Sequence, residues 1–320
     1  MKHRFNELLQ QSFKSEDTEE WLDVHFTRPI GLAFALMWIR LGVHPNAITV
    51  LSIFLGIGSA VMFYFTDWVH NLMGVLLLML ANFCDSTDGQ MARLTGKKTL
   101  VGRILDGFAG DVWFFCIYWA IILRLWPQPI PGTTVVWGIW IVLIACVAGL
   151  LCHSPQSSLA DYYRQIHLLF LKGRDGAELD NSAAQQAIYE SLPRRGHLLE
   201  RLFRSNYARY CRSQERRTPE FQRLLATVRE RHGSVDQLPQ AMREQFLNGS
   251  RPLMPLTNIL TFNTRAIVLY ITCLADCPWV YFLFEMTVMS LLYVYMHQRH
   301  ERLCRRMRAA ADQDTVTHDD

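Results

Sequence analysis

The sequence lacks an apolar core of signal-peptide length at its beginning. Residues 1–21 carry scattered charges instead, so we expect no cleaved leader and expect the first residues to stay in the cytoplasm. Cys273 and Cys277 are four residues apart, and no second pair of cysteines accompanies them at the spacing of zinc-finger ligands. We therefore interpret the eight cysteines as free thiols rather than as disulfides or metal ligands.

Charge is also scarce. Charged residues make up 19% of the 320 residues, whereas 50% are hydrophobic, and the mean hydropathy lies just above zero. That mean hydropathy is high for a soluble protein and low for a chain made only of membrane spans. The composition therefore predicts a membrane domain joined to a polar part.

Six apolar stretches approach the length of about 20 residues that a helix needs to cross the hydrocarbon core. They cover residues 48–66, 72–94, 100–126, 134–153, 257–275 and 278–297. The uncharged run between Arg28 and Arg40 is too short to cross, which favours a helix lying in the interface. Pro45 and Asn46 then predict a turn and an N-cap for the first span. We predict an all-α integral membrane protein with six transmembrane helices preceded by an interfacial amphipathic helix.

Basic residues are nearly missing from one side of this layout. With the N-terminus inside, the three outer loops hold a single basic residue, Arg124, while Lys97, Lys98 and the arginine-rich tail lie inside. Cytoplasmic loops collect Lys and Arg, so this bias predicts that both termini are cytoplasmic. A bacterial inner membrane or its equivalent is the expected location.

A polar, arginine-rich insert separates the fourth and fifth spans. Leu198, Leu199, Leu202 and Phe203 recur in it at helical spacing. Its charge could bind anionic lipid, or it could belong to a solvated helical subdomain; no recognition motif accompanies it, so we expect no nucleic acid. The predicted parts are 1–43 (cytoplasmic N-terminus and interfacial helix), 44–153 (membrane helices one to four), 154–256 (cytoplasmic helical insert), 257–297 (membrane helices five and six) and 298–320 (cytoplasmic tail).

Carboxylates follow the second apolar stretch and return at the start of the third. Asp85 and Asp88 are three residues apart, so they share one face of a helix. Asp106 lies near the start of the next span, which returns antiparallel from the same end, so the three can converge. Carboxylates buried at the ends of membrane spans without a positive partner cost several kcal/mol of free energy each, and they repel one another. Hard oxygen ligands at this density suit Mg²⁺ or Mn²⁺, and Mg²⁺ commonly lies between carboxylates and substrate phosphates.

Small residues and one cation accompany the carboxylates. Gly89, Ala92 and Gly102 leave bare backbone. Two explanations fit such residues equally: tight packing of membrane helices, and close approach of a flat ring or a diphosphate to the backbone. Arg93, two turns below Asp85, adds a positive charge on roughly the same side.

Seven of these residues match, at every spacing, the first seven fixed positions of the signature D-x2-D-G-x2-A-R-x8-G-x3-D-x3-D. They are Asp85, Asp88, Gly89, Ala92, Arg93, Gly102 and Asp106. By this motif and its six-span layout, the chain resembles the CDP-alcohol phosphatidyltransferase family. It departs at the last position, where Gly110 stands and Asp111 follows one residue later. A regular helix would turn Asp111 about 100° from the expected direction; a π-bulge could restore that direction, and otherwise a water or a substrate atom would fill the coordination position.

The resemblance implies transfer of a phospho-alcohol group from a CDP-linked donor to a hydroxyl acceptor, with release of CMP. It implies Mg²⁺ or Mn²⁺, two ions, and a homodimer. The implied metal ligands are Asp85, Asp88, Asp106 and Asp111. The implied cytidine- and diphosphate-binding residues are Gly89, Ala92, Arg93 and Gly102. Asp106 and Asp111 are the expected catalytic residues, with Asp111 as the base for the acceptor hydroxyl, and the site is expected on the cytoplasmic side.

The acceptor is left open. Arg164 and Arg265 lie just past or within apolar stretches, and either could contact a phosphorylated acceptor or an acidic head group. Arg265 could equally begin a span and reach the interface. A CDP-diacylglycerol donor would need a polar alcohol, and a soluble CDP-alcohol would need a lipid hydroxyl. The segment DGQMARLTG favours an inositol-type head group by similarity alone.

Two alternatives stay open beside this hypothesis. An ion- or proton-coupled transporter would place carboxylates near the bilayer midplane and would not need the small residues. A family member that lost catalysis together with its fourth aspartate would still bind CDP.

Overall fold

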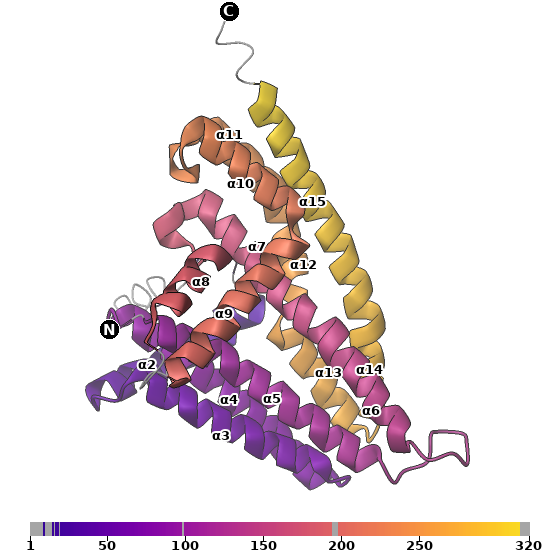
Figure 1. Ribbon diagram of the computed structural model, residues 1–320. Helices are drawn as coiled ribbons and strands as arrows, with labels where there is room; N and C mark the ends of the chain where they lie inside the picture. Colours follow the sequence, from indigo (N-terminus) through magenta and orange to yellow (C-terminus); the bar gives the residue numbers. More distant parts are fainter. Residues whose placement is uncertain are drawn as a thin grey trace, which may run out of the picture. The chain divides into compact units, whose positions relative to one another are not determined.

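The computed structural model describes residues 9, 15, 17–18, 20–97, 99–193 and 198–313, and this part of the chain is helical without a strand (Figure 1). The all-α prediction is thereby confirmed. Contacts divide the chain into two compact units. The first is Met1–Ser154 with Phe262–Met289, and the second is Pro155–Thr261 with Ser290–Asp320.

The first unit carries the carboxylates. Within it, α3 packs along both α4 and α5, and α2 packs against α4. Its helices are η1 (Asp23–Thr27), α2 (Arg28–Arg40), α3 (Pro45–Tyr64), α4 (Trp68–Leu94), α5 (Leu100–Leu125), α6 (Gly138–Cys146), η2 (Val147–His153), α13 (Phe262–Leu274), α14 (Trp279–Phe284) and η6 (Glu285–Met289).

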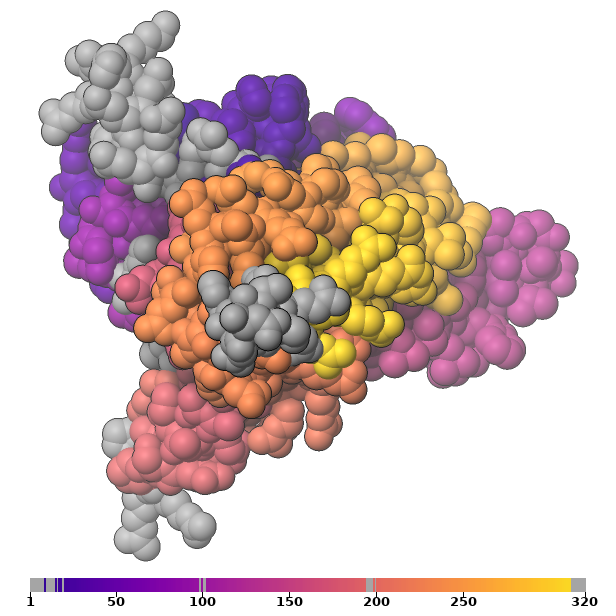
Figure 2. Space-filling view, turned by 90° about the horizontal axis from the view of Figure 1, so that it is seen from above, coloured from indigo at the N-terminus to yellow at the C-terminus, as the bar shows by residue number. Residues whose placement is uncertain are grey.

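The second unit is built mostly from the polar part of the chain. Here α8 pairs with α9, and α10 and α11 lie against α15, as the orange and yellow residues of Figure 2 show. Its helices are α7 (Ser154–Lys172), η3 (Arg174–Gly176), α8 (Ser182–Ser191), α9 (Leu198–Arg217), α10 (Pro219–His232), η4 (Val235–Gln237), α11 (Gln240–Ser250), η5 (Arg251–Leu253), α12 (Met254–Ile259) and α15 (Ser290–Gln313).

Among the described residues, five helical stretches are long and apolar enough to cross a membrane. They are Pro45–Tyr64, Trp68–Leu94, Gly102–Leu125, Gly138–Lys172 and Trp279–Ala311. These stretches indicate an integral membrane protein, and they correspond to the first four and the last of the six predicted spans. The predicted stretch 257–275 instead divides between α12 and α13, and the 13 residues of α13 are fewer than a straight span needs. A sixth span and an interfacial position of α2 therefore stay predictions.

Local capping explains where the three packed helices begin. The α3 N-cap is His44, whose Nδ1 accepts from the Asn46 amide at 3.2 Å, so the prediction of an Asn46 cap is wrong. Pro45 takes the first helical position, where its fixed φ and missing N–H cost nothing. Asp67 caps α4, and Thr99 caps α5 by accepting from the Gly102 amide at 3.0 Å.

Close packing of α3 against α5 depends on one glycine. A Cβ on Gly56 would lie 2.0 Å from Cδ1 of Trp113, so the indole occupies the space that a side chain at position 56 would fill. Trp113 is only 2% exposed and belongs to the core that α3, α4 and α5 share with α13 and α14. The separation of α3 and α5 is thus set by a small-residue contact of the kind that membrane helices favour.

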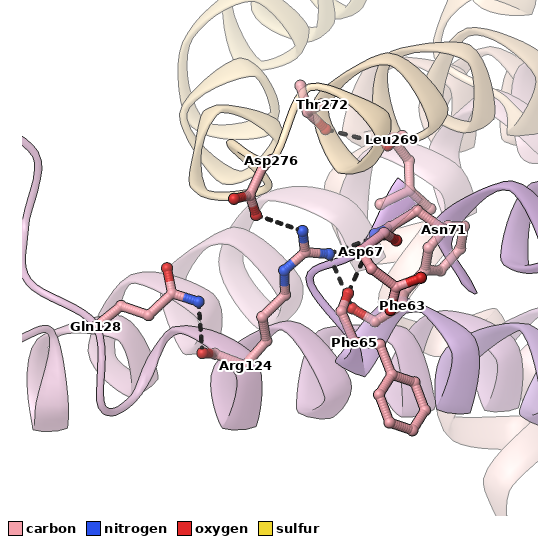
Figure 3. A network of polar contacts seen from close by, with 9 residues as sticks. All are labelled: Phe63, Phe65, Asp67, Asn71, Arg124, Gln128, Leu269, Thr272 and Asp276. Atoms are coloured by element: carbon pink, nitrogen blue, oxygen red, sulfur yellow. Dashed lines mark hydrogen bonds and ion pairs between the residues drawn. The ribbon is translucent and has the colours of Figure 1, made fainter. Parts of the chain in front are cut away.

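Arg124, near the last residue of α5, joins the helix ends that lie away from the carboxylates (Figure 3). Its Nη1 donates to the Phe63 carbonyl at 3.1 Å and to Asn71 Oδ1 at 2.8 Å. Its Nη2 pairs with Asp276 Oδ1 at 2.6 Å, although the arginine side chain itself is fully buried. One guanidinium therefore holds α3, α4, α5 and the turn after α13 together, which leaves little of its charge uncompensated.

Candidate active site

Asp85, Asp88 and Asp106 converge. Each offers a carboxylate oxygen that lies within 4.8 Å of those of the other two. Asp85 and Asp88 stand on one face of the last turns of α4, and Asp106 stands on the second turn of α5, which returns after a short turn. Gly96, at a φ of 69°, supplies the left-handed backbone that this turn requires. Among the described residues, these three are the Asp, Glu, His or Cys side chains that lie close enough together to hold a metal ion.

The three carboxylates differ in exposure. Asp88 is 4% exposed, Asp85 is half-buried and Asp106 is exposed, so the group opens at Asp106. The Thr49 hydroxyl of α3 donates to Asp88 Oδ2, and Asp85 and Asp106 interact electrostatically with each other. Carboxylates this close cannot all be ionised without a proton or a cation between them. The arrangement therefore suits cation binding.

Two arginines interact electrostatically with the carboxylates. Arg28, the first residue of α2, interacts electrostatically with Asp85, and Arg93 interacts with Asp88. Helix α2 is held against α4 by polar contacts, because Gln90 Nε2 donates to the Arg28 carbonyl at 3.1 Å. A Cβ on Gly31 would lie 2.8 Å from that same Nε2, so the two helices meet closely.

The small residues of the motif lie at close contacts. A Cβ on Gly102 would stand 3.2 Å from Asn46 Oδ1, so the start of α5 meets the start of α3 there. A Cβ on Gly89 would stand 3.3 Å from Nη1 of Arg93, and Ala92 is half-buried. The close contact with Asn46 is enough to explain a glycine at position 102. Nucleotide binding by Gly89, Ala92, Arg93 and Gly102 stays a prediction.

Comparison with known families finds a match for the segment that holds this site. Residues 42–163 match the family model described as CDP-alcohol phosphatidyltransferase. Residues 42–163 form a CDP-alcohol phosphatidyltransferase domain. The match runs from the turn before α3 into α7, and it contains the whole carboxylate group. A search of curated proteins finds no match to the chain.

The family implies transfer of a phosphatidyl group from a CDP-alcohol in phospholipid synthesis, and its members generally use divalent metals. The resemblance inferred from the motif is thus confirmed at the level of the family. The phosphatidyltransferase domain ends before Arg164 and does not include Arg265.

Asp111 lies in the phosphatidyltransferase domain but outside the carboxylate group. The whole of α5 is α-helical, so no π-bulge restores the direction of Asp111; η1, η2 and η6 are the π-helical segments of the described chain. Five residues of regular helix turn Asp111 about 140° from Asp106. Asp111 is exposed, and a Cβ on Gly107 or Gly110 would meet no described atom within 4 Å.

Both candidate acceptor arginines are engaged within the chain. Arg164 of α7 donates from Nε and Nη2 to Asn258 Oδ1, at 2.9 and 2.7 Å. Arg265 of α13 is 1% exposed and donates to Glu285 Oε2 and, at 2.9 Å, to His153 Nδ1. Tyr281 also donates to Glu285, at 2.7 Å. Arg265 therefore belongs to a buried polar cluster, and contact of either arginine with an acceptor stays a prediction.

Sequence reasoning missed three side chains. Thr49 lies one turn after Pro45, and small polar residues on one face of an apolar span were the signal that could have found it. Glu285 is an ionisable residue inside the last apolar stretch, where such a residue calls for a partner. Arg28 gave no signal, because its approach to Asp85 depends on how α2 docks.

Proposed function

We propose that this chain is a divalent-metal-dependent phosphotransferase that moves a phospho-alcohol group from a CDP-linked donor to a hydroxyl acceptor and releases CMP. The observation that carries the proposal is the approach of three carboxylates from α4 and α5 within 4.8 Å, inside a segment that matches this family. The reaction forms a bond from the acceptor oxygen to the phosphorus bearing the alcohol and breaks the diphosphate linkage to CMP.

The side chains fit the metal that this chemistry uses. All three are hard oxygen donors, which Mg²⁺ and Mn²⁺ prefer, and a cluster of like charges needs a compensating cation. Asp85, Asp88 and Asp106 would hold two ions, with Thr49 fixing the orientation of Asp88. A bound metal neutralises the diphosphate and stabilises the departing phosphate oxygen.

The remaining roles fall to residues beside the group. Arg93 holds phosphate or the Asp88 carboxylate in place, and Gly89, Ala92 and Gly102 let the nucleotide approach the backbone. The acceptor hydroxyl must lose its proton as it attacks, and Asp111 takes that proton. Its exposure beside the bare surface of Gly107 and Gly110 supports access for an acceptor.

The finer proposals rest on the sequence. The charge bias supports cytoplasmic termini and a cytoplasmic site, with α13 as part of a sixth crossing. The acceptor is a polar alcohol of inositol type if CDP-diacylglycerol is the donor. The family also supports a homodimer.

The test is CMP release by the purified full-length protein in lipid, with a panel of CDP donors and hydroxyl acceptors, with and without Mg²⁺ or Mn²⁺. We expect CMP only with metal and one donor–acceptor pair, and none from Asp88→Asn. A folded protein that binds CDP without releasing CMP would be a degenerate binder. A protein that does not bind CDP either would point to transport.

A further inference from the structure

One side of helix α9 is exposed along the length of the helix. The large hydrophobic residues exposed on it are Leu198, 76% exposed, Leu202, 54% exposed, and Tyr210, 39% exposed. Its exposed residues are Leu198, Leu202, Asn206, Arg209, Tyr210, Arg212 and Arg216. At 100° per residue these fall within about 160° of arc, so they form one continuous surface. We call these seven residues the α9 face.

The charge on the α9 face has one sign. Arg209 donates only to Ser205 of its own helix, at 3.1 Å. Within the described chain, Arg212 and Arg216 form neither a hydrogen bond nor an ion pair. The two carboxylates of α9 have partners elsewhere: Glu215 accepts from the Ser182 amide at 2.8 Å, and Glu200 lies 3.9 Å from Arg204. The α9 face therefore carries three cations and no anion.

The opposite side of α9 is occupied by α8. Arg201 donates to the Leu192 carbonyl at 2.5 Å and lies over the Tyr189 ring, 4.5 Å from its centre. Ala208 and Cys211 are 1% and 3% exposed. The inward side of α9 is thus packed, and its arginine has a hydrogen-bond partner. The α9 face can therefore meet a partner without rearrangement of the fold.

We propose that the α9 face docks on the surface of an anionic phospholipid bilayer. Exposed leucines and arginines share this surface, so it offers apolar side chains for insertion at the head-group boundary and cations for anionic head groups. Each arginine near an anionic leaflet adds attraction within a Debye length of the surface. The chain carries its own membrane spans, so the leaflet is present at high effective concentration. Nucleic acid would leave the two exposed leucines unused.

The test places a photo-crosslinking benzoylphenylalanine at position 210 of the full-length protein. The protein is reconstituted in nanodiscs of phosphatidylcholine alone or mixed with phosphatidylglycerol, and adducts on the α9 peptide are identified by mass spectrometry. We expect lipid adducts that rise several-fold with phosphatidylglycerol and fall at high salt. The same crosslinker at Glu230, an exposed position on α10, controls for random collision.

A matched pair of variants separates the α9 face from net charge. Arg212→Glu/Arg216→Glu should reduce the lipid adducts several-fold. Arg174→Glu/Arg229→Glu changes the same charge at exposed arginines of η3 and α10 and should leave the adducts unchanged. Equal adducts in both lipid compositions, or no lipid adduct at all, would overturn the proposal. Adducts to a second copy of the chain would assign the α9 face to a protein interface instead.

Discussion

Thr49 on α3 donates its hydroxyl to Oδ2 of Asp88 on α4, so a span that bears no motif residue orients a carboxylate of the site. Asp88 is the most buried of the three carboxylates, and at 4% exposure it has little water to replace a lost partner. The three packed helices of the domain therefore all contribute to the group: α3 the donor, α4 two carboxylates and α5 the third.

The first prediction concerns that hydroxyl. Thr49→Val keeps the shape of the side chain and removes the donor to Asp88. Partners behind a metal ligand are worth roughly 10–100-fold in metal affinity or activity, so the Mg²⁺ or Mn²⁺ concentration for half-maximal CMP release should rise by about that factor. Thr49→Ser retains the donor and should stay near wild type. An unchanged metal dependence in Thr49→Val would show that the hydrogen bond does not orient a ligand.

A second prediction separates Asp111 from the group. Asp88→Asn should abolish CMP release, whereas Asp111→Asn should lower the rate by about 10²–10⁴, the usual contribution of a general base. Because Asp111 stands outside the group, the metal concentration for half-maximal release should stay unchanged in that variant. A wild-type rate for Asp111→Asn would remove it from the mechanism, and a shifted metal dependence would make it a ligand.

Helix spacing provides a third prediction. Gly56→Ala would put a methyl group 2.0 Å from Trp113, and overpacking of this kind costs about 1–3 kcal/mol. The midpoint of thermal unfolding in detergent should fall. Gly110→Ala is the matched control, since its methyl group meets no described atom within 4 Å and alanine is favoured over glycine in a helix by about 0.5–1 kcal/mol. Equal midpoints for the two variants would contradict the packing argument.

The fourth prediction concerns the buried pair Arg265–Glu285. Removing one partner leaves a buried charge uncompensated and costs about 3–5 kcal/mol, so Arg265→Met should express poorly or unfold at lower temperature. Arg265→Met/Glu285→Met removes both charges and should recover much of that stability. If the folded double variant releases CMP with an unchanged KM for the acceptor, Arg265 does not bind the acceptor. A KM raised about tenfold or more, at unchanged stability, would support that role.

The convergence of the carboxylates was predictable because it follows from local geometry. Two residues three apart share a helix face, and a short turn brings the next helix back beside them, so Asp85, Asp88 and Asp106 meet. The contributions of Thr49 and Arg28 were not predictable in this way, because each depends on how a separate helix packs. The residue pattern of a single sequence does not predict how such separate helices pack.

Averaged hydropathy predicted a single membrane span over residues 257–275, where the structure has two helices. An average over about 20 residues conceals the interruption at Leu260 and Thr261, where α12 ends before α13 begins. The same averaging passed over Glu285, since a single carboxylate changes the mean little. Arg124 was assigned to an outer loop from its place at the end of a span, although its side chain turns inward to carbonyl and carboxylate oxygens.

That inward turn of Arg124 has a consequence for movement. It fastens α3, α4 and α5 to one another at one extremity, whereas the opposite extremity carries Asp106 in the open. The carboxylate end is tied as well, because a short turn joins α4 to α5 there and Thr49 of α3 is hydrogen-bonded to Asp88 of α4. The three helices therefore form a frame that is braced at both extremities, which restrains relative movement of the carboxylates that it carries.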